Sequence, residues 1–193
     1  MLIFVNGGSG SGKSAFAESV AQKLGGKLIY VATMPIFSDD DRKKVERHHK
    51  LRAGKGFDTL EQPKRLADIP ENGETVLIEC MSTHVANMMF DPEILPDENV
   101  VLRRAAVPAS EEDSAVQIWT KTIRKELEEV LARDGNTIIV SAEAGMDGAS
   151  YSQETEQYRQ VLVNTNRYLT ETADAAFEVV CGIPVVIKGE LPC

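Results

Sequence analysis

The stretch that decides the fold lies near the amino terminus, where residues 3–14 read Ile-Phe-Val-Asn-Gly-Gly-Ser-Gly-Ser-Gly-Lys-Ser. The apolar run over 2–5 predicts a strand that leads into the glycines, and residues 14–24 carry apolar side chains at helical spacing. Between them stands the pattern Gly-x4-Gly-Lys-Ser, from Gly7 to Ser14. A strand, this loop and a helix, in that order, are typical of a phosphate-binding loop.

Each residue type in this loop has a physical task in binding phosphate. Glycines let backbone N–H groups turn towards phosphate oxygens, and the helix that follows adds positive potential at its N-terminus. Lys13 is expected to reach the β- and γ-phosphates of a nucleotide, and the Ser14 hydroxyl is expected to bind Mg²⁺. The alternative is a glycine-rich turn that binds nothing.

The composition limits the class of protein. The chain has 193 residues and a hydrophobic content of 42%, which fits a single domain spanning residues 1–193. Its net charge of -9 argues against a nucleic-acid surface, because such surfaces need clustered Lys and Arg. The 3 cysteines form no C-x-x-C pair, so neither a disulfide framework nor a zinc site follows. No stretch reads as a signal peptide or a membrane span, and we expect a soluble, cytoplasmic protein.

Strand and helix signals alternate along the rest of the chain. Strands are predicted over 27–33, 75–79, 136–140, 175–181 and 183–188, and helices over 42–50, 81–90, 114–132 and 154–172. This alternation predicts a P-loop NTPase-like α/β fold with a mostly parallel sheet covered by helices on both faces. The last two strands flank Gly182 and are expected to pair antiparallel at one edge. Residues 91–114 are rich in acids and prolines with little periodicity, and we expect a loop there.

The carboxyl ends of parallel strands are where an open α/β sheet binds its ligands. The predicted strand over 75–79 ends in Glu79, which we interpret as a Walker-B-like acid that holds Mg²⁺ across from Ser14. An ordinary strand-end acid near solvent is the alternative. The strand over 136–140 is followed by Ser141-Ala-Glu143-Ala-Gly145, a second candidate for nucleotide or substrate contact.

Two adjacent histidines, His48 and His49, stand among several Lys and Arg residues between 43 and 52. Such a segment is usually a solvated helix face, and that is the alternative. In a chain this acidic, however, the segment concentrates positive charge where a nucleotide's phosphates would lie. A neutral imidazole can attack phosphorus, and nearby cations stabilise the negative charge that develops.

Several segments match a known family in order and spacing. The loop and its strand match the family's opening, and Tyr30-Val-Ala-Thr33 is similar to its Tyr-Ile-Ala-Thr strand. An acidic stretch then leads to the basic segment with its histidines, followed by Thr59-Leu-Glu61-Gln-Pro63, like the family's Thr-x-Glu-x-Pro. Residues 77–83 and 179–188 are similar to its third strand and its carboxyl end. The chain thus resembles the bifunctional adenosylcobinamide kinase/adenosylcobinamide-phosphate guanylyltransferase family of cobalamin biosynthesis.

The resemblance implies two reactions. In the first, the hydroxyl of the aminopropanol arm of adenosylcobinamide attacks the γ-phosphate of ATP or GTP. In the second, GTP guanylylates a histidine, pyrophosphate leaves, and adenosylcobinamide phosphate takes up the GMP to give adenosylcobinamide-GDP. Spacing from Tyr30 places the family's nucleophile at His48, whereas spacing back from Thr59 places it at His49, so both are candidates. The resemblance also implies a homo-oligomer, a trimer in this family.

The resemblance carries over a set of functional residues by position. The catalytic set is His48 or His49 with Lys13 and Glu79, and the Mg²⁺ ligands are Ser14 and Glu79. The contacts to the guanine nucleotide are Gly7, Gly8, Ser9, Gly10, Ser11, Gly12, Lys13, Ser14, Ala32, Thr33, Met34, His48, His49, Lys50, Leu51, Glu61 and Glu79.

The chain departs from the family's pattern in places. Phe57 stands near the position of a tryptophan, Ala142 replaces an asparagine after the fourth predicted strand, and Ser11 replaces an arginine in the loop. Three alternatives therefore stay open. These are a simple small-molecule kinase without a covalent intermediate, a nucleotide-binding regulatory switch, and a family member with the transferase activity alone.

Overall fold

The computed structural model of the protein describes residues 1–35, 39, 42–43, 45–46, 52, 54–61, 65–66, 69, 72–90, 115–143 and 149–191. The helix expected over 42–50 lies partly outside these residues, and the loop expected over 91–114 lies wholly outside them. Within the basic segment, residues 42, 43, 45, 46 and 52 are described, and all of them are helical.

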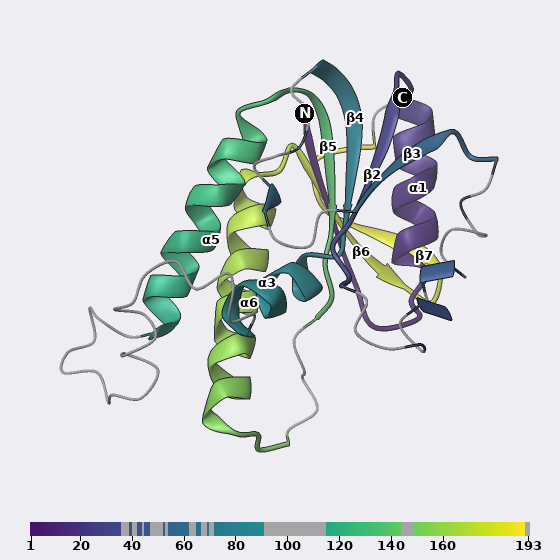
Figure 1. Ribbon diagram of the computed structural model, residues 1–193. Helices are drawn as coiled ribbons and strands as arrows, with labels where there is room; N and C mark the ends of the chain where they lie inside the picture. The colour runs from purple at the N-terminus through teal and green to yellow at the C-terminus, as the bar shows by residue number, and fades with distance from the viewer. Residues whose placement is uncertain are drawn as a thin grey trace.

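Seven strands form one sheet in the order β3-β2-β4-β5-β1-β6-β7 (Figure 1). Neighbouring strands are parallel except β6 and β7, which run antiparallel. The strands are β1 (Leu2–Asn6), β2 (Leu28–Ala32), β3 (Phe57–Glu61), β4 (Asn72–Glu79), β5 (Asp134–Val140), β6 (Ala175–Val180) and β7 (Ile183–Lys188). The predicted fold class is confirmed, including the antiparallel pair at one edge.

Helices cover both faces of the sheet. Figure 1 shows α1 (Lys13–Leu24) on one face and α3 (Met81–Phe90), α5 (Ala115–Leu131) and α6 (Gln153–Thr172) on the other. Ser152 caps the start of α6, and its hydroxyl accepts a hydrogen bond from the Thr155 N–H at 3.4 Å. Glu154 and Glu156 stand in its first turn, where carboxylates interact favourably with the helix dipole.

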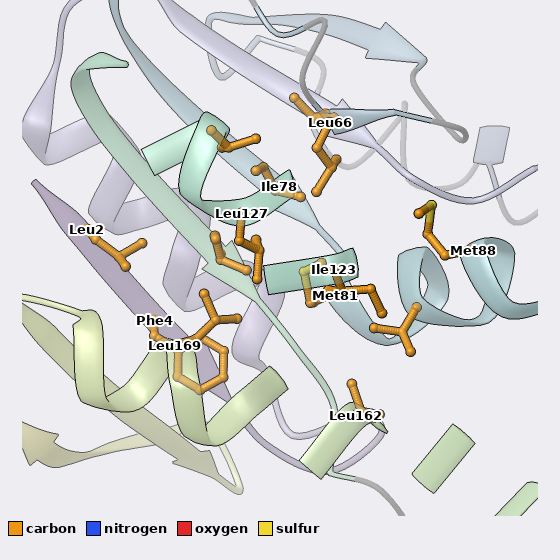
Figure 2. Close-up of a cluster of buried hydrophobic side chains, with 14 of the residues drawn as sticks. Leu2, Phe4, Leu66, Ile78, Met81, Met88, Ile123, Leu127, Leu162 and Leu169 are labelled. Atoms are coloured by element: carbon orange, nitrogen blue, oxygen red, sulfur yellow. The ribbon is translucent and has the colours of Figure 1, made fainter. Parts of the chain in front are cut away.

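The core is divided by the sheet into two layers. On the α1 face, Ile3, Val5 and Tyr30 pack against Ala17 and Val20 of the helix. The larger layer lies on the other face, where Figure 2 shows side chains of β1, β4, α3, α5 and α6 meeting. Leu127 of α5 is 1% exposed there, and truncating such a leucine to alanine costs about 2–5 kcal/mol of stability. This packing holds the strand ends, and so the phosphate-binding loop, in place.

A buried polar contact joins α3 to α5. His84 Nε2 lies 2.7 Å from Glu126 Oε2, and the other oxygen of Glu126 accepts the Leu66 N–H at 2.7 Å. His84 is fully buried, so this contact replaces the water that the imidazole would otherwise bind. It fixes α3, whose first turn follows directly after Glu79.

The structure adds one strand that the sequence pattern did not predict, β3 at the open edge beside β2. Its side chains are half-buried or exposed, and Asp58, Thr59 and Glu61 face solvent. A polar run of this kind lacks the alternation of apolar residues that identifies a strand. It forms because its backbone pairs in register with residues 28–32 of β2.

The other edge of the sheet, β7, keeps its apolar side chains in contact with solvent. Ile183, Val185, Val186 and Ile187 have exposed fractions between 45% and 66%.

Cys80 and Cys181 are free thiols. Within the described part of the chain, none of the helices has the length and apolar character needed to cross a membrane.

Candidate active site

The phosphate-binding loop is locked between α1 and the turn that joins β6 to β7. Gly12 caps α1 in the left-handed conformation, with φ 92°, which favours glycine. Gly7 has φ 154°, and a Cβ added there would lie 2.6 Å from the Val179 carbonyl oxygen and 2.8 Å from Ser11 Oγ. The Gly182 N–H also donates to the Ser11 carbonyl at 2.7 Å. No larger residue fits at Gly7 unless the loop or β6 moves.

The two charged and polar residues at the end of the loop have defined partners. Lys13 Nζ donates to the Gly8 carbonyl at 3.1 Å, so the ammonium group lies over the loop. The Ser14 hydroxyl donates to Glu79 Oε1, which joins the first turn of α1 to the end of β4. Glu79 thus stands across from Ser14, where the sequence pattern predicted it.

Tyr30 holds the second oxygen of Glu79. Its hydroxyl donates to Glu79 Oε2 at 3.0 Å, from the neighbouring strand β2. Burial of the phenol raises its pKa, and the negative charge of Glu79 raises it further. Tyr30 therefore stays a neutral hydrogen-bond donor at physiological pH and keeps the carboxylate pointed at Ser14.

A pocket of about 150 Å³ opens beside this carboxylate. It is lined by Tyr30, Ala32, Met34, Val45, Arg52, Glu79, Cys80 and Thr83. The Arg52 guanidinium carbon lies 3.5 Å from the centre of the Tyr30 ring, in a cation–π contact. The Arg52 side chain is buried, with 6% of the residue exposed, and its Nε and Nη1 have no hydrogen-bond partner among the described residues.

These unpartnered nitrogens are the unusual feature of the pocket. A buried N–H group without an acceptor costs about 1–3 kcal/mol, and more when the group is charged. The pocket therefore presents a cation with free donors a short way from the phosphate-binding loop. An anionic or carbonyl oxygen of a ligand would satisfy them.

The turn that follows β2 forms the rim of the pocket and is held by α3. The Thr33 hydroxyl donates to the Cys80 carbonyl at 2.9 Å and accepts the Cys80 N–H at 2.7 Å. The Thr33 carbonyl accepts the Asn87 side-chain amide at 2.8 Å. These contacts fix Ala32 and Met34 as walls of the pocket.

The structure brings together part of the set that the sequence predicted. The loop from Gly7 to Ser14, the Ala32–Thr33–Met34 turn and Glu79 gather at the carboxyl edge of the sheet. Glu61 lies exposed at the end of β3, in register with Ala32 but outside the pocket lining. His48, His49, Lys50 and Leu51 lie outside the described residues.

Five residues of the pocket lining were not among the predicted site residues, namely Tyr30, Val45, Arg52, Cys80 and Thr83. Arg52 was read only as part of a basic segment, and Tyr30 only as a family match. Val45 stands seven positions before Arg52, a spacing that places two residues on one face of a helix, and this was the available signal. Nothing local in the sequence indicates that Tyr30 reaches Glu79, because that contact joins two strands.

The fold and the loop define a P-loop nucleotide-binding protein. A strand, the Gly7–Ser14 loop and α1 follow one another, and an acid on a neighbouring parallel strand meets Ser14. The sequence identifies the group within this class. The family model of cobinamide kinase / cobinamide phosphate guanyltransferase matches residues 3–187, and the chain belongs to that family.

Curated relatives cover the chain almost end to end. The bifunctional adenosylcobalamin biosynthesis protein CobU of Escherichia coli is 30% identical over 97% of this chain and 100% of the relative. The CobU protein of Salmonella typhimurium is 28% identical over the same shares. The corresponding CobP protein of Pseudomonas aeruginosa is 25% identical over 98% of this chain and 99% of the relative.

Among solved structures, a prototypical ATPase from the type III secretion system of pathogenic bacteria gives a TM-score of 0.48 at 12% identity. The match covers 92% of this chain and 51% of that one, so the chain spans about half its length. A likeness this weak adds nothing to the assignment.

Proposed function

We propose that this protein phosphorylates adenosylcobinamide with a nucleoside triphosphate and then transfers GMP from GTP to adenosylcobinamide phosphate through a guanylylated histidine. The observation that carries the proposal is the pocket beside Ser14, which combines Glu79 with the buried cation of Arg52. Family membership supplies the substrate class, and the pocket supplies a place for the nucleotide next to the loop.

The phosphate chain of the nucleotide is assigned to the loop from Gly7 to Ser14, with Lys13 on the β- and γ-phosphates. The Ser14 hydroxyl and the Glu79 carboxylate touch each other, and a pair of oxygen ligands at this place fits Mg²⁺. When bound, the ion offsets the charge of the phosphates during transfer. Tyr30 keeps Glu79 in position for that role.

The residues on either side of the two histidines support their assignment to this pocket. Val45 and Arg52 both line the pocket, and His48 and His49 fall between them in the sequence. On a helix, positions three, four and seven residues after Val45 share its face, and these positions are His48, His49 and Arg52. This spacing supports a histidine that faces the same pocket.

The chemistry then runs in two displacements. An imidazole nitrogen attacks the α-phosphorus of GTP, the bond from that phosphorus to the bridging oxygen breaks, and pyrophosphate leaves. A phosphate oxygen of adenosylcobinamide phosphate then attacks the same phosphorus, the P–N bond breaks, and the imidazole is freed. Dividing one displacement into two lowers each barrier, and Arg52 is suited to stabilise the charge that develops.

The test is covalent labelling. Protein incubated with Mg²⁺ and GTP radiolabelled at the α-phosphate should keep an acid-labile, base-stable label after denaturation. GTP labelled at the γ-phosphate should leave none, because that label departs with pyrophosphate. Of the two single variants His48→Ala and His49→Ala, one should lose the label and the other should keep it. If neither does, the histidine assignment is wrong, and if the wild type never labels, a simple kinase or a regulatory switch is favoured.

We also infer that the protein acts in the cytoplasm as a homo-oligomer, and that β7 pairs with a second copy. An edge strand with several exposed apolar side chains is a template for pairing, and β7 has four between residues 183 and 187. Light scattering should show an oligomer for the wild type and a smaller species for Val186→Lys. An unchanged mass in the variant would place the interface elsewhere.

A further inference from the structure

A row of polar side chains crosses three central strands on the face opposite the pocket. The Ser141 N–H donates to the Val5 carbonyl at 2.9 Å, which continues the pairing of β5 with β1 by one residue. Asn6, the last residue of β1, is in register with Glu178 of β6. Side chains alternate along a strand, and Phe4, Ile139 and Ala176 belong to the core under α5 and α6. Asn6, Ser141 and Glu178, each two residues further on, therefore point to that same face.

Three side-chain oxygens at this row accept no hydrogen bond from the described residues. Ser141 is fully buried, and its Oγ has no hydrogen-bond partner in the part of the chain that the structure describes. Asn6 Oδ1 is also buried and has no partner there. Asn166 of α6 donates its Nδ2 to the Ala142 carbonyl at 3.2 Å, which fixes the amide, and its Oδ1 is again buried without a partner. Each such oxygen costs about 1–3 kcal/mol, so three of them at one place indicate a ligand that brings N–H or O–H groups.

A pair of carboxyl groups stands at the outer end of the row. Glu143, three residues beyond β5, is exposed to solvent, and its carboxyl group lies beside that of Glu178. Two carboxyl groups can share a hydrogen bond only while one of them holds a proton. Partial desolvation, this bond and the charge of Glu178 together raise the pKa of Glu143. A carboxylate in this setting takes up a proton more readily than an isolated one.

The position of the row relative to the loop indicates which ligand it suits. Asn6 directly precedes Gly7, so the row begins where the phosphate-binding loop begins. A phosphate acceptor must approach the γ-phosphate from beside the loop, and the pocket with Arg52 lies on the α1 face, where Tyr30 packs. The row offers the other approach, at the carboxyl edge of the strands.

We propose that Asn6, Ser141 and Asn166 bind the alcohol that accepts the γ-phosphate, and that Glu143, paired with Glu178, takes the proton of its hydroxyl. The unpartnered oxygens suit an acceptor that carries N–H or O–H donors close to the reacting hydroxyl. This inference rests on the proposed function, since it requires a nucleotide on the Lys13 loop.

The step balances without a further reactant. The hydroxyl oxygen attacks the γ-phosphorus, and the bond from that phosphorus to the β–γ bridging oxygen breaks. The nucleoside diphosphate leaves with the electrons of that bond, and the hydroxyl proton passes to Glu143. Solvent then receives the proton from the exposed carboxyl group. General base catalysis of this kind contributes about 10²–10⁴-fold to a rate.

The two activities of the proposed function allow a separating experiment. Glu143→Gln should lower the kcat for transfer of the γ-phosphate from ATP to adenosylcobinamide by about 100-fold or more. Labelling of the protein by GTP carrying an α-phosphate label should be unchanged in the same variant, because guanylylation does not use the row. Glu129→Gln, at an exposed glutamate of α5, is the matched control and should leave both activities unchanged.

Each other outcome contradicts the inference. If Glu143→Gln phosphorylates normally, or if both activities fall together in a variant whose thermal unfolding is unchanged, Glu143 is not the base. If Glu143→Gln does not fold, Glu143→Asp replaces it; that variant should retain labelling and lose phosphorylation by at least about tenfold. A wild type that phosphorylates and labels while Glu143→Gln does both equally well overturns only this inference, whereas a wild type that does neither overturns the proposed function as well.

Discussion

The two sides of the phosphate-binding loop differ in the hydrogen-bonding groups that they leave unsatisfied. On the α1 face, the pocket beside Glu79 contains Arg52, whose Nε and Nη1 are buried donors without acceptors. On the α6 face, Ser141, Asn6 and Asn166 have buried oxygens that accept no hydrogen bond from any described residue. One side is suited to an electron-rich ligand group, and the other to a ligand that donates hydrogen bonds. This division suits the proposed arrangement, in which the nucleotide occupies one side of the loop and the alcohol reaches its γ-phosphate from the other.

The largest expected effect comes from a change at the loop that both sides share. Gly7→Ala places a methyl group 2.6 Å from the Val179 carbonyl oxygen, in a backbone conformation that strains alanine. We expect the loop to be displaced and GTP affinity to fall by at least about tenfold, with a loss of about 1–3 kcal/mol in stability.

Calorimetric titration with GTP and thermal unfolding measure the two losses at Gly7. Gly8→Ala is the control for stability, because nothing lies within 4 Å of a Cβ there and its φ is not left-handed. If both variants unfold at the wild-type temperature, the contact with β6 does not constrain the loop.

A change at Arg52 tests the pocket on the α1 face alone. Arg52→Gln removes the cation and its stacking on Tyr30, and we expect guanylylation at low GTP to slow by about tenfold, a loss of about 1.4 kcal/mol. Arg52→Lys keeps the charge but loses the planar donors, so it should restore only part of the rate. The initial rate of histidine labelling at several GTP concentrations measures both. Full activity of the lysine variant would show that charge alone matters.

The pH dependence of phosphorylation tests the carboxyl pair and the polar row on the α6 face alone. A base must be ionised to act, and the pKa of Glu143 is raised, so phosphorylation should weaken on acidification at a higher pH than for an ordinary glutamate. Glu178→Gln removes the neighbouring charge, lowers the pKa of Glu143, and should shift the acid limb of the kcat profile to lower pH. The effect of pH on stability has the opposite sign. A carboxyl pKa that is raised in the folded state increases the free energy of unfolding as the pH falls. An acid limb that does not move in Glu178→Gln would exclude the pair as the titrating group.

The smallest effect is expected at Ser141. Ser141→Ala removes a buried hydroxyl that has no partner, so stability should stay the same or rise, by no more than about 1 kcal/mol. The same change should raise the KM for adenosylcobinamide and leave the KM for GTP as it is. Urea unfolding and steady-state kinetics give the two values. A loss of stability would show that the hydroxyl has a structural partner.

The sequence predicted those parts of the site that depend on local pattern. Lys13, Ser14 and the strand-end Glu79 follow from spacing along single elements, and the structure brings Ser14 and Glu79 into contact. Arg52 and Tyr30 were not predicted as a pair, because their stacking depends on how a distant segment packs against β2. The row of Asn6 and Ser141 could not be predicted from the sequence for another reason. A missing hydrogen-bond partner becomes visible only when every neighbour is placed.

The fold shows the same division. The parallel strands and the helices over 81–90, 114–132 and 154–172 agree with the elements that apolar periodicity predicted to within a few residues. The polar edge strand β3 was missed, since its pairing with β2 rather than its side chains defines it.

The turn at Cys181–Gly182 does more than reverse the chain. It donates a hydrogen bond to the Ser11 carbonyl at 2.7 Å, and the hairpin that it closes ends in the exposed strand β7. The outermost surface of the sheet is thus one covalent turn away from the backbone that cradles phosphate. If a partner bound at β7 changes the affinity of the loop for phosphate, linkage requires that bound phosphate change the affinity for that partner by the same factor.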